Sequence, residues 1–181
     1  MGGCYLIPDF EQSGNLPRGR FVATVQEVYD VLVKGPEFTS STTRDSIWDD
    51  FTLLVDSIKR KRVRVPAAFV GGGFVTKALN PTDIDAALFI DTSRISSATT
   101  LTAVHQIATN SNSVGLKVDA FLIQWHPDGS ENGGDPSYLA TRGKWDDFWQ
   151  REVAKADRHP PQRSHSMPVR GYLEVILDGY I

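Results

Sequence analysis

Two aspartates one residue apart, Asp83 and Asp85, follow the glycine run Gly71–Gly73 in this chain. Side chains alternate between the two faces of a strand, so this spacing predicts that both carboxylates point to one face while Ile84 points into the core. Two carboxylates on one face supply the hard oxygen ligands that Mg²⁺ prefers. The pair therefore predicts a divalent-metal site.

The three glycines predict a phosphate-binding turn beside that metal site. They follow the apolar run 67–70, which is typical of a buried strand. Backbone N–H groups of Gly71, Gly72 and Gly73 could approach a phosphate without a Cβ in the way. Thr76 and Lys77 come soon after and are further candidates for phosphate binding.

A third carboxylate, Asp119, lies in the apolar segment 116–123, which is rich in strand-forming residues. A charge in such a segment needs a partner or a metal ion. The alternative for Asp83 is a simple turn, because Pro81-Thr82-Asp83 also suits an Asx-type turn entering a strand. The apolar segments around the acidic pair, together with Asp119, favour the metal site.

These residues resemble the nucleotidyltransferase superfamily with the DNA polymerase β-like fold. Its signature is an apolar strand, a Gly-Gly or Gly-Ser pair, a short spacer, an Asp-x-Asp pair and a third carboxylate on a neighbouring strand. The chain also resembles a group of small bacterial and phage proteins of this type. The matching segments are Leu16-Pro17-Arg18-Gly19, Gly72-Gly73-Phe74-Val75-Thr76 and Pro81-Thr82-Asp83-Ile84-Asp85. The chain departs from that group at Gly73, where serine is usual.

The resemblance implies transfer of a nucleoside monophosphate from an NTP such as ATP to a hydroxyl of a protein or tRNA. Mg²⁺ or Mn²⁺ would be held by Asp83, Asp85 and Asp119, which would also be the catalytic residues. Relatives of this size act in toxin–antitoxin or phage-defence settings. Two alternatives remain: a binding module or antitoxin that kept the fold and lost turnover, and a transferase that modifies small molecules.

The hydrophobic pattern predicts one α+β domain over residues 1–181, with a mixed β-sheet and helices packed mainly on one face. An irregular leader covers about residues 1–19. Helices are expected after a capping box at Thr24–Glu27, over the stripe 47–58, near 101–108 and around 145–153, and strands at 67–70, 84–90, 116–123 and 172–177. The Gly- and Asp-rich segment 126–136 is expected to be a loop, either a lid over the nucleotide or a loop without a role.

Composition is that of an ordinary globular protein, with 40% hydrophobic residues and a formal net charge of −3. The acidic balance argues against wrapping bulk nucleic acid. Cys4 is the single cysteine, which excludes an intrachain disulfide. No apolar run reaches membrane-spanning length, so we expect a cytoplasmic protein without membrane contact.

Several cations are candidates for polyanion binding. Arg44 and Arg170 are weaker phosphate candidates, each more typical of a surface or salt-bridge residue. The run Lys59–Arg62 either caps the end of a helix as a solvated face or forms an edge that binds RNA.

Overall fold

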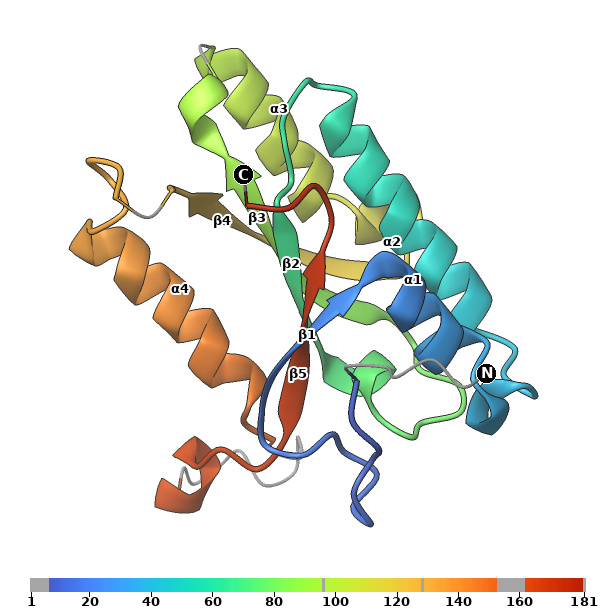
Figure 1. The fold of residues 1–181 in the computed structure, drawn as a ribbon. Coiled ribbons are helices and arrows are strands. Elements are labelled where there is room, and N and C mark those ends of the chain that lie inside the picture. Colours follow the sequence, from blue (N-terminus) through green and yellow to red (C-terminus); the bar gives the residue numbers. More distant parts are fainter. Residues whose placement is uncertain (1–6, 96, 128, 153–161, 181) are drawn as a thin grey trace.

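The computed structural model describes residues 7–95, 97–127, 129–152 and 162–180. Five strands form one mixed sheet in the order β1-β5-β2-β3-β4 (Figure 1). The strands are β1 (Gly19–Thr24), β2 (Ala67–Gly71), β3 (Ile84–Asp91), β4 (Val118–Trp125) and β5 (Gly171–Ile176). The main helices are α1 (Val25–Val28), which a π-helical turn extends over Tyr29–Val33, then α2 (Arg44–Lys59), α3 (Ala98–Thr109) and α4 (Pro136–Trp149). The predicted α+β class with a mixed sheet is confirmed.

Strand β1 is an element that sequence reasoning missed. It pairs in parallel with β5, so that Arg20 lies beside Tyr172, and it closes one edge of the sheet. The first residue of β1, Gly19, has a positive φ of 129°, and its last residue, Thr24, is also the N-cap of α1. Neither end is therefore typical of a strand. A short edge strand whose partner is far away in the chain has little local signal.

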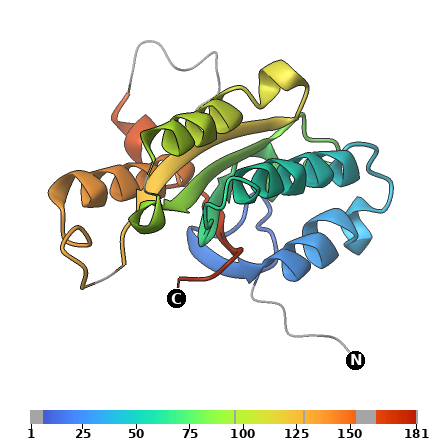
Figure 2. The ribbon, with the colours of Figure 1, turned by 90° about the horizontal axis from the view of Figure 1, so that it is seen from above.

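The helices cover the two faces of the sheet unequally (Figures 1 and 2). Helices α1, α2 and α3 pack on one face, where Val70, Leu88 and Val175 belong to the larger hydrophobic core. Among the described residues, α4 is the main helix that covers the opposite face, and its Trp145 and Trp149 form a second core with side chains of β2 to β5. We call these the three-helix face and the α4 face.

Local signals explain where several helices begin. Thr24 accepts a hydrogen bond from the Glu27 backbone N–H, while the Glu27 carboxylate accepts one from the Thr24 N–H, which confirms the predicted capping box. Asp135 caps α4 through the backbone N–H groups of Ser137 and Tyr138, with Pro136 as the first helical residue. The helix ends at Trp149, earlier than expected.

Some sequence expectations fall beyond what the structure describes. Cys4 and Val153 lie outside the described residues, as does part of the leader. Within the last helix, Trp145 and Trp149 are buried as expected, whereas Phe148 is 50% exposed. Its ring lies edge-on to those of Trp145 and Trp149.

Candidate active site

Asp85 and Asp119 are direct neighbours across the parallel strands β3 and β4. Paired residues of adjacent strands project to the same face, and Ala87 and Ile123 further along these strands belong to the core under α4. Both carboxylates therefore face α4. Asp83 lies one residue before β3 begins and is half-buried, as are the other two.

The carboxylates of Asp83 and Asp119 are close enough to Asp85 for their charges to act on it. Burial, followed by the negative charges of Asp83 and Asp119, raises the pKa of Asp85 to about 6, while the positive charge of Arg170 opposes the shift. In the described part of the chain, no three His, Cys, Asp or Glu side chains converge tightly enough to form a ready metal cage. The carboxylates are neighbours without being a preformed metal centre.

The glycine turn lies directly against Asp85. Gly71, the last residue of β2, is the strand partner of Asp85. Gly72 has a φ of +69°, and a Cβ there would lie 1.7 Å from the Asp85 Oδ2 atom. A Cβ on Gly71 would come within 2.6 Å of the Trp149 ring. Both positions therefore require glycine, one for backbone conformation and space and the other for space alone.

Gly73 differs from the two glycines before it. It is exposed, its φ is not in the left-handed region, and the nearest atom to a Cβ there is Pro81 Cβ at 3.9 Å. A serine would fit at this position. Small bacterial and phage proteins that the chain resembles usually have serine at this position. Lack of space therefore does not explain why this chain has glycine there.

The other two candidates for phosphate binding are occupied elsewhere. The Thr76 hydroxyl donates to the Gly73 carbonyl at 2.8 Å and so closes the turn. The Lys77 ammonium pairs with Glu37 at 3.5 Å, and both side chains are exposed. Neither has a contact with the three carboxylates among the residues that the structure describes.

Arg44 organises the segment after the glycines from inside the protein. It has no exposed surface, and its two terminal nitrogens donate to four backbone carbonyls at 2.7–2.8 Å, those of Leu32, Phe74, Thr76 and Ala78. Its guanidinium also stacks 3.7 Å from the Phe38 ring centroid. Burial lowers its pKa to about 10. Arg44 is therefore a structural residue and not a surface phosphate ligand.

Arg170 lies beside the acidic site. Its backbone N–H donates to the Gln150 carbonyl and its Nε to the Trp149 carbonyl, both at 3.2 Å, which attaches it to the C-terminal end of α4. The Trp149 ring in turn covers Gly71, the strand partner of Asp85. The terminal nitrogens of Arg170 form no hydrogen bond or ion pair with a described residue. Sequence spacing could not give this residue weight, because it comes 85 positions after Asp85 in the chain.

The basic run at the end of α2 is partly used within the fold. Lys59 pairs with Asp178 at 2.5 Å, and Arg64 donates to the carbonyls of Asp178 and Gly179. These contacts attach the segment after β5 to α2. Arg60, Lys61 and Arg62 are exposed, which agrees with a solvated helix end.

Comparisons with known proteins identify the family of this chain without a function. Within the described residues, no helix is long and apolar enough to span a membrane. Neither a curated protein nor a solved structure matches the chain significantly. The model of a family described as "Family of unknown function (DUF6932)" matches residues 8–175, so the chain belongs to this family.

Proposed function

We propose that this protein is a metal-dependent nucleotidyltransferase that moves a nucleoside monophosphate from an NTP to a hydroxyl of a protein or tRNA, as a cytoplasmic enzyme. One observation carries the proposal. Asp85 and Asp119 are cross-strand partners that face the same side, with Asp83 beside them and the Gly71–Gly72 turn against Asp85. This arrangement is what supports the proposal.

The donor set fits a hard divalent cation, since all three side chains are carboxylates and all are at least partly accessible. Asp83, Asp85 and Asp119 would hold Mg²⁺ or Mn²⁺. When bound, the metal neutralises the negative charge that develops on the phosphoryl oxygens.

The protein's own residues have distinct roles in this proposal. An acceptor hydroxyl attacks the α-phosphorus, the bond to the pyrophosphate oxygen breaks, and the hydroxyl proton passes to Asp119. The free guanidinium nitrogens of Arg170 bind phosphate oxygens as a planar fork, which suits an oxyanion better than a point charge does. Gly72 lets the backbone approach both Asp85 and the phosphates.

The test is transfer of label from NTPs carrying α-phosphorus label, with Mg²⁺ or Mn²⁺, to a co-purified protein, to the chain itself or to bulk tRNA. Asp83→Asn should abolish transfer. Asp49→Asn, an exposed aspartate on α2, is the matched control and should leave transfer unchanged. Binding of each of the four NTPs, measured as metal-dependent thermal stabilisation, gives a readout that does not require the acceptor. Absence of both transfer and metal-dependent NTP binding would reject the proposal.

Gly73 supports a second candidate, a nucleotidyltransferase-fold binding module or antitoxin without turnover. The position has room for a side chain yet supplies no hydroxyl to a phosphate. Gly73→Ser should fold normally, and for an enzyme it should strengthen NTP binding. A binding module would instead keep its partner affinity in Asp83→Asn and show no transfer before or after Gly73→Ser.

A further inference from the structure

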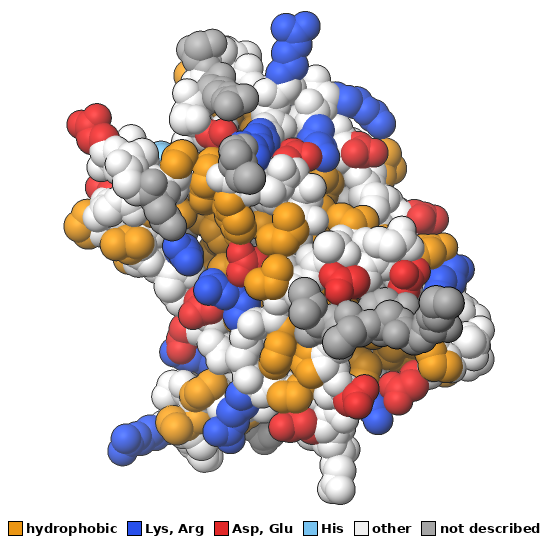
Figure 3. All heavy atoms as spheres, viewed as in Figure 1, with side chains coloured by type: hydrophobic (Ala, Val, Ile, Leu, Met, Phe, Trp, Pro, Cys, Tyr) orange, Lys and Arg blue, Asp and Glu red, His pale blue; other side chains and the backbone are white. Residues whose placement is uncertain are grey.

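A cavity of about 350 Å³ lies on the α4 face, between α4, the sheet and the segment after β5. Its volume is in the range of small-molecule sites. Figure 3 shows hydrophobic side chains gathered in this region, with charged side chains beside them. Four aromatic residues and two charged ones line it: Phe89, Trp125, Tyr138, Tyr180, Arg142 and Glu174.

The cavity is separate from the acidic site on the same face. The space between α4 and the sheet is filled by Phe121, whose ring centroid lies 4.4 Å from that of Trp145, and by Trp149, which stacks on Trp145 at 5.6 Å. Trp149 also covers Gly71 next to Asp85. Aromatic packing thus lies between the carboxylates and the cavity.

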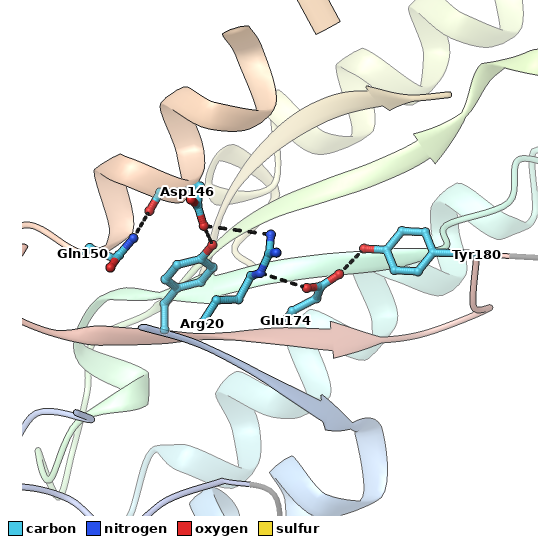
Figure 4. A network of polar contacts seen from close by, with 6 residues as sticks. Arg20, Asp146, Gln150, Glu174 and Tyr180 are labelled. Carbon is cyan, nitrogen blue, oxygen red and sulfur yellow. Dashed lines mark hydrogen bonds and ion pairs between the residues drawn. The ribbon is translucent and has the colours of Figure 1, made fainter. Parts of the chain in front are cut away.

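The charge of Glu174 is compensated within the protein (Figure 4). The Tyr180 hydroxyl donates to this carboxylate, and the Arg20 Nε lies 3.2 Å from its other oxygen. Arg20 also lies 3.9 Å from Asp146, which accepts a hydrogen bond from the Tyr172 hydroxyl. Glu174 is 9% exposed, and it is held in one orientation from two sides.

Arg142 is not compensated in this way. It lies one helical turn after Tyr138 and one before Asp146, on the side of α4 that faces the sheet. It is half-buried, yet it forms no hydrogen bond or ion pair with any residue of the described ranges. It lines the cavity together with Tyr180. A half-buried guanidinium usually has an anionic or carbonyl partner.

Tyr138 supplies a second free donor. It is 6% exposed, so its ring is packed into the wall, but its hydroxyl makes no hydrogen bond with a described residue. Since Tyr138 and Arg142 are four residues apart on one helix, their polar ends lie on the same side. Together they form a donor pair at the edge of an aromatic cavity.

We infer that this cavity binds a small aromatic anion, with its ring packed against the rings of Trp125 and Tyr180 and its acidic group on Arg142 and the Tyr138 hydroxyl. Aromatic rings prefer aromatic neighbours in offset or edge-on contact, and a guanidinium binds carboxylate or phosphate through paired hydrogen bonds. The acidic group can therefore belong to an aromatic carboxylate or to a nucleoside monophosphate. The inference does not depend on the proposed transferase activity.

Isothermal calorimetry on the full chain tests the inference with two probes, indole-3-acetate and AMP, whose relative affinities identify the source of the acidic group. Uncharged indole and adenosine, and the non-aromatic anions acetate and inorganic phosphate, are the ligand controls. At least one aromatic anion should bind at least tenfold more tightly than its uncharged and its non-aromatic counterparts. Binding should be independent of divalent metal.

Variants separate this cavity from the acidic site. Arg142→Met should weaken binding roughly tenfold or more, and Tyr138→Phe severalfold, whereas Lys144→Met on the exposed side of the same helix should have no effect. Asp85→Asn should also leave binding unchanged. The inference would be overturned if neither probe binds, or if Arg142→Met binds the probe as tightly as wild type does. Loss of binding in Asp85→Asn would also overturn it. None of these results would bear on the transferase test, which uses NTPs and metal.

Discussion

The two faces of the sheet carry the same strands but differ in chemistry. On the three-helix face, side chains of β2, β3 and β5 pack against α1, α2 and α3 in an almost wholly apolar core. On the α4 face, the same strands present Asp85, Glu174 and Tyr172 among aromatic rings. Apolar packing stabilises a fold, whereas half-buried charges are retained mainly where they have a task. The larger apolar core thus lies on one face, and the residues of the proposed active site lie on the other.

The largest expected loss of stability comes from a substitution in the core of the three-helix face. Phe51 of α2 is fully buried and stacks on Trp48 at 5.1 Å. Phe51→Ala should lower the free energy of unfolding by about 3–5 kcal/mol, through lost burial and a cavity, measured by denaturant titration. Phe148→Ala, at a side chain of α4 that is half exposed, is the control and should cost far less. If both variants lost the same free energy of unfolding, the three-helix core would not be more important for stability than the exposed part of α4.

Next in size is the loss of the buried arginine that joins α2 to the glycine segment. Arg44→Met leaves four backbone carbonyls without their donor and should cost about 2–4 kcal/mol. Arg44→Lys keeps the charge, but one ammonium cannot span all four carbonyls, so it should restore only part of this stability. Thermal unfolding measures both variants, and complete recovery in Arg44→Lys would contradict the role of the guanidinium fork.

A smaller effect should follow from filling the turn beside Asp85. Gly72→Ala places a Cβ against the carboxylate at a positive φ and should cost about 1–3 kcal/mol. The double variant Gly72→Ala with Asp85→Ala should recover part of that cost, because the nearest clashing atoms are gone. Gly73→Ala is the matched control, with no atom nearer than 3.9 Å. Additive losses in the double variant would show that the two residues are not in contact.

The smallest expected effect concerns the half-buried charge of Asp85 on the α4 face. The pKa of Asp85 is about 6 in the folded protein and near 3.8 in the unfolded chain. Between about pH 4 and pH 6, Asp85 therefore keeps a proton in the folded state that it has released in the unfolded state. The free energy of unfolding thus falls as pH rises from about 4 to above 6. Asp85→Asn removes this cost and should stabilise the protein by on the order of 1–2 kcal/mol at pH 8, after allowance for solvent screening.

The gain in stability of Asp85→Asn over wild type should vanish near pH 4, where Asp85 is protonated in the folded protein. It should also be smaller when Mg²⁺ is present, because the metal stabilises the ionised carboxylate of the wild-type protein. Denaturant titrations of both proteins at pH 4 and pH 8 give the comparison. A gain of equal size at both pH values would mean that the stabilisation does not come from the carboxylate charge.

Sequence reasoning predicted the central strands and the acidic residues because their signals are local. The period-two pattern around Asp83 and Asp85, the glycines after a buried strand and the apolar stripe of α2 each occupy a few adjacent positions. It missed β1, and it could not place Arg170 beside Asp85. Strand β1 depends on pairing with β5, more than a hundred residues away. Arg170 lies at the end of α4 and acts on Asp85, which precedes it by 85 positions.

Which residue types are available for chemistry follows from the sequence alone: three aspartates in or beside strand-forming segments, and glycines where a backbone must come close. Their relations in space arise only from packing. Strand register placed Asp119 beside Asp85, burial assigned Arg44 to the backbone, and the end of α4 brought Arg170 to the carboxylates. Periodicity is encoded between neighbours in the chain, whereas register, burial and charge pairing arise only when distant segments pack together.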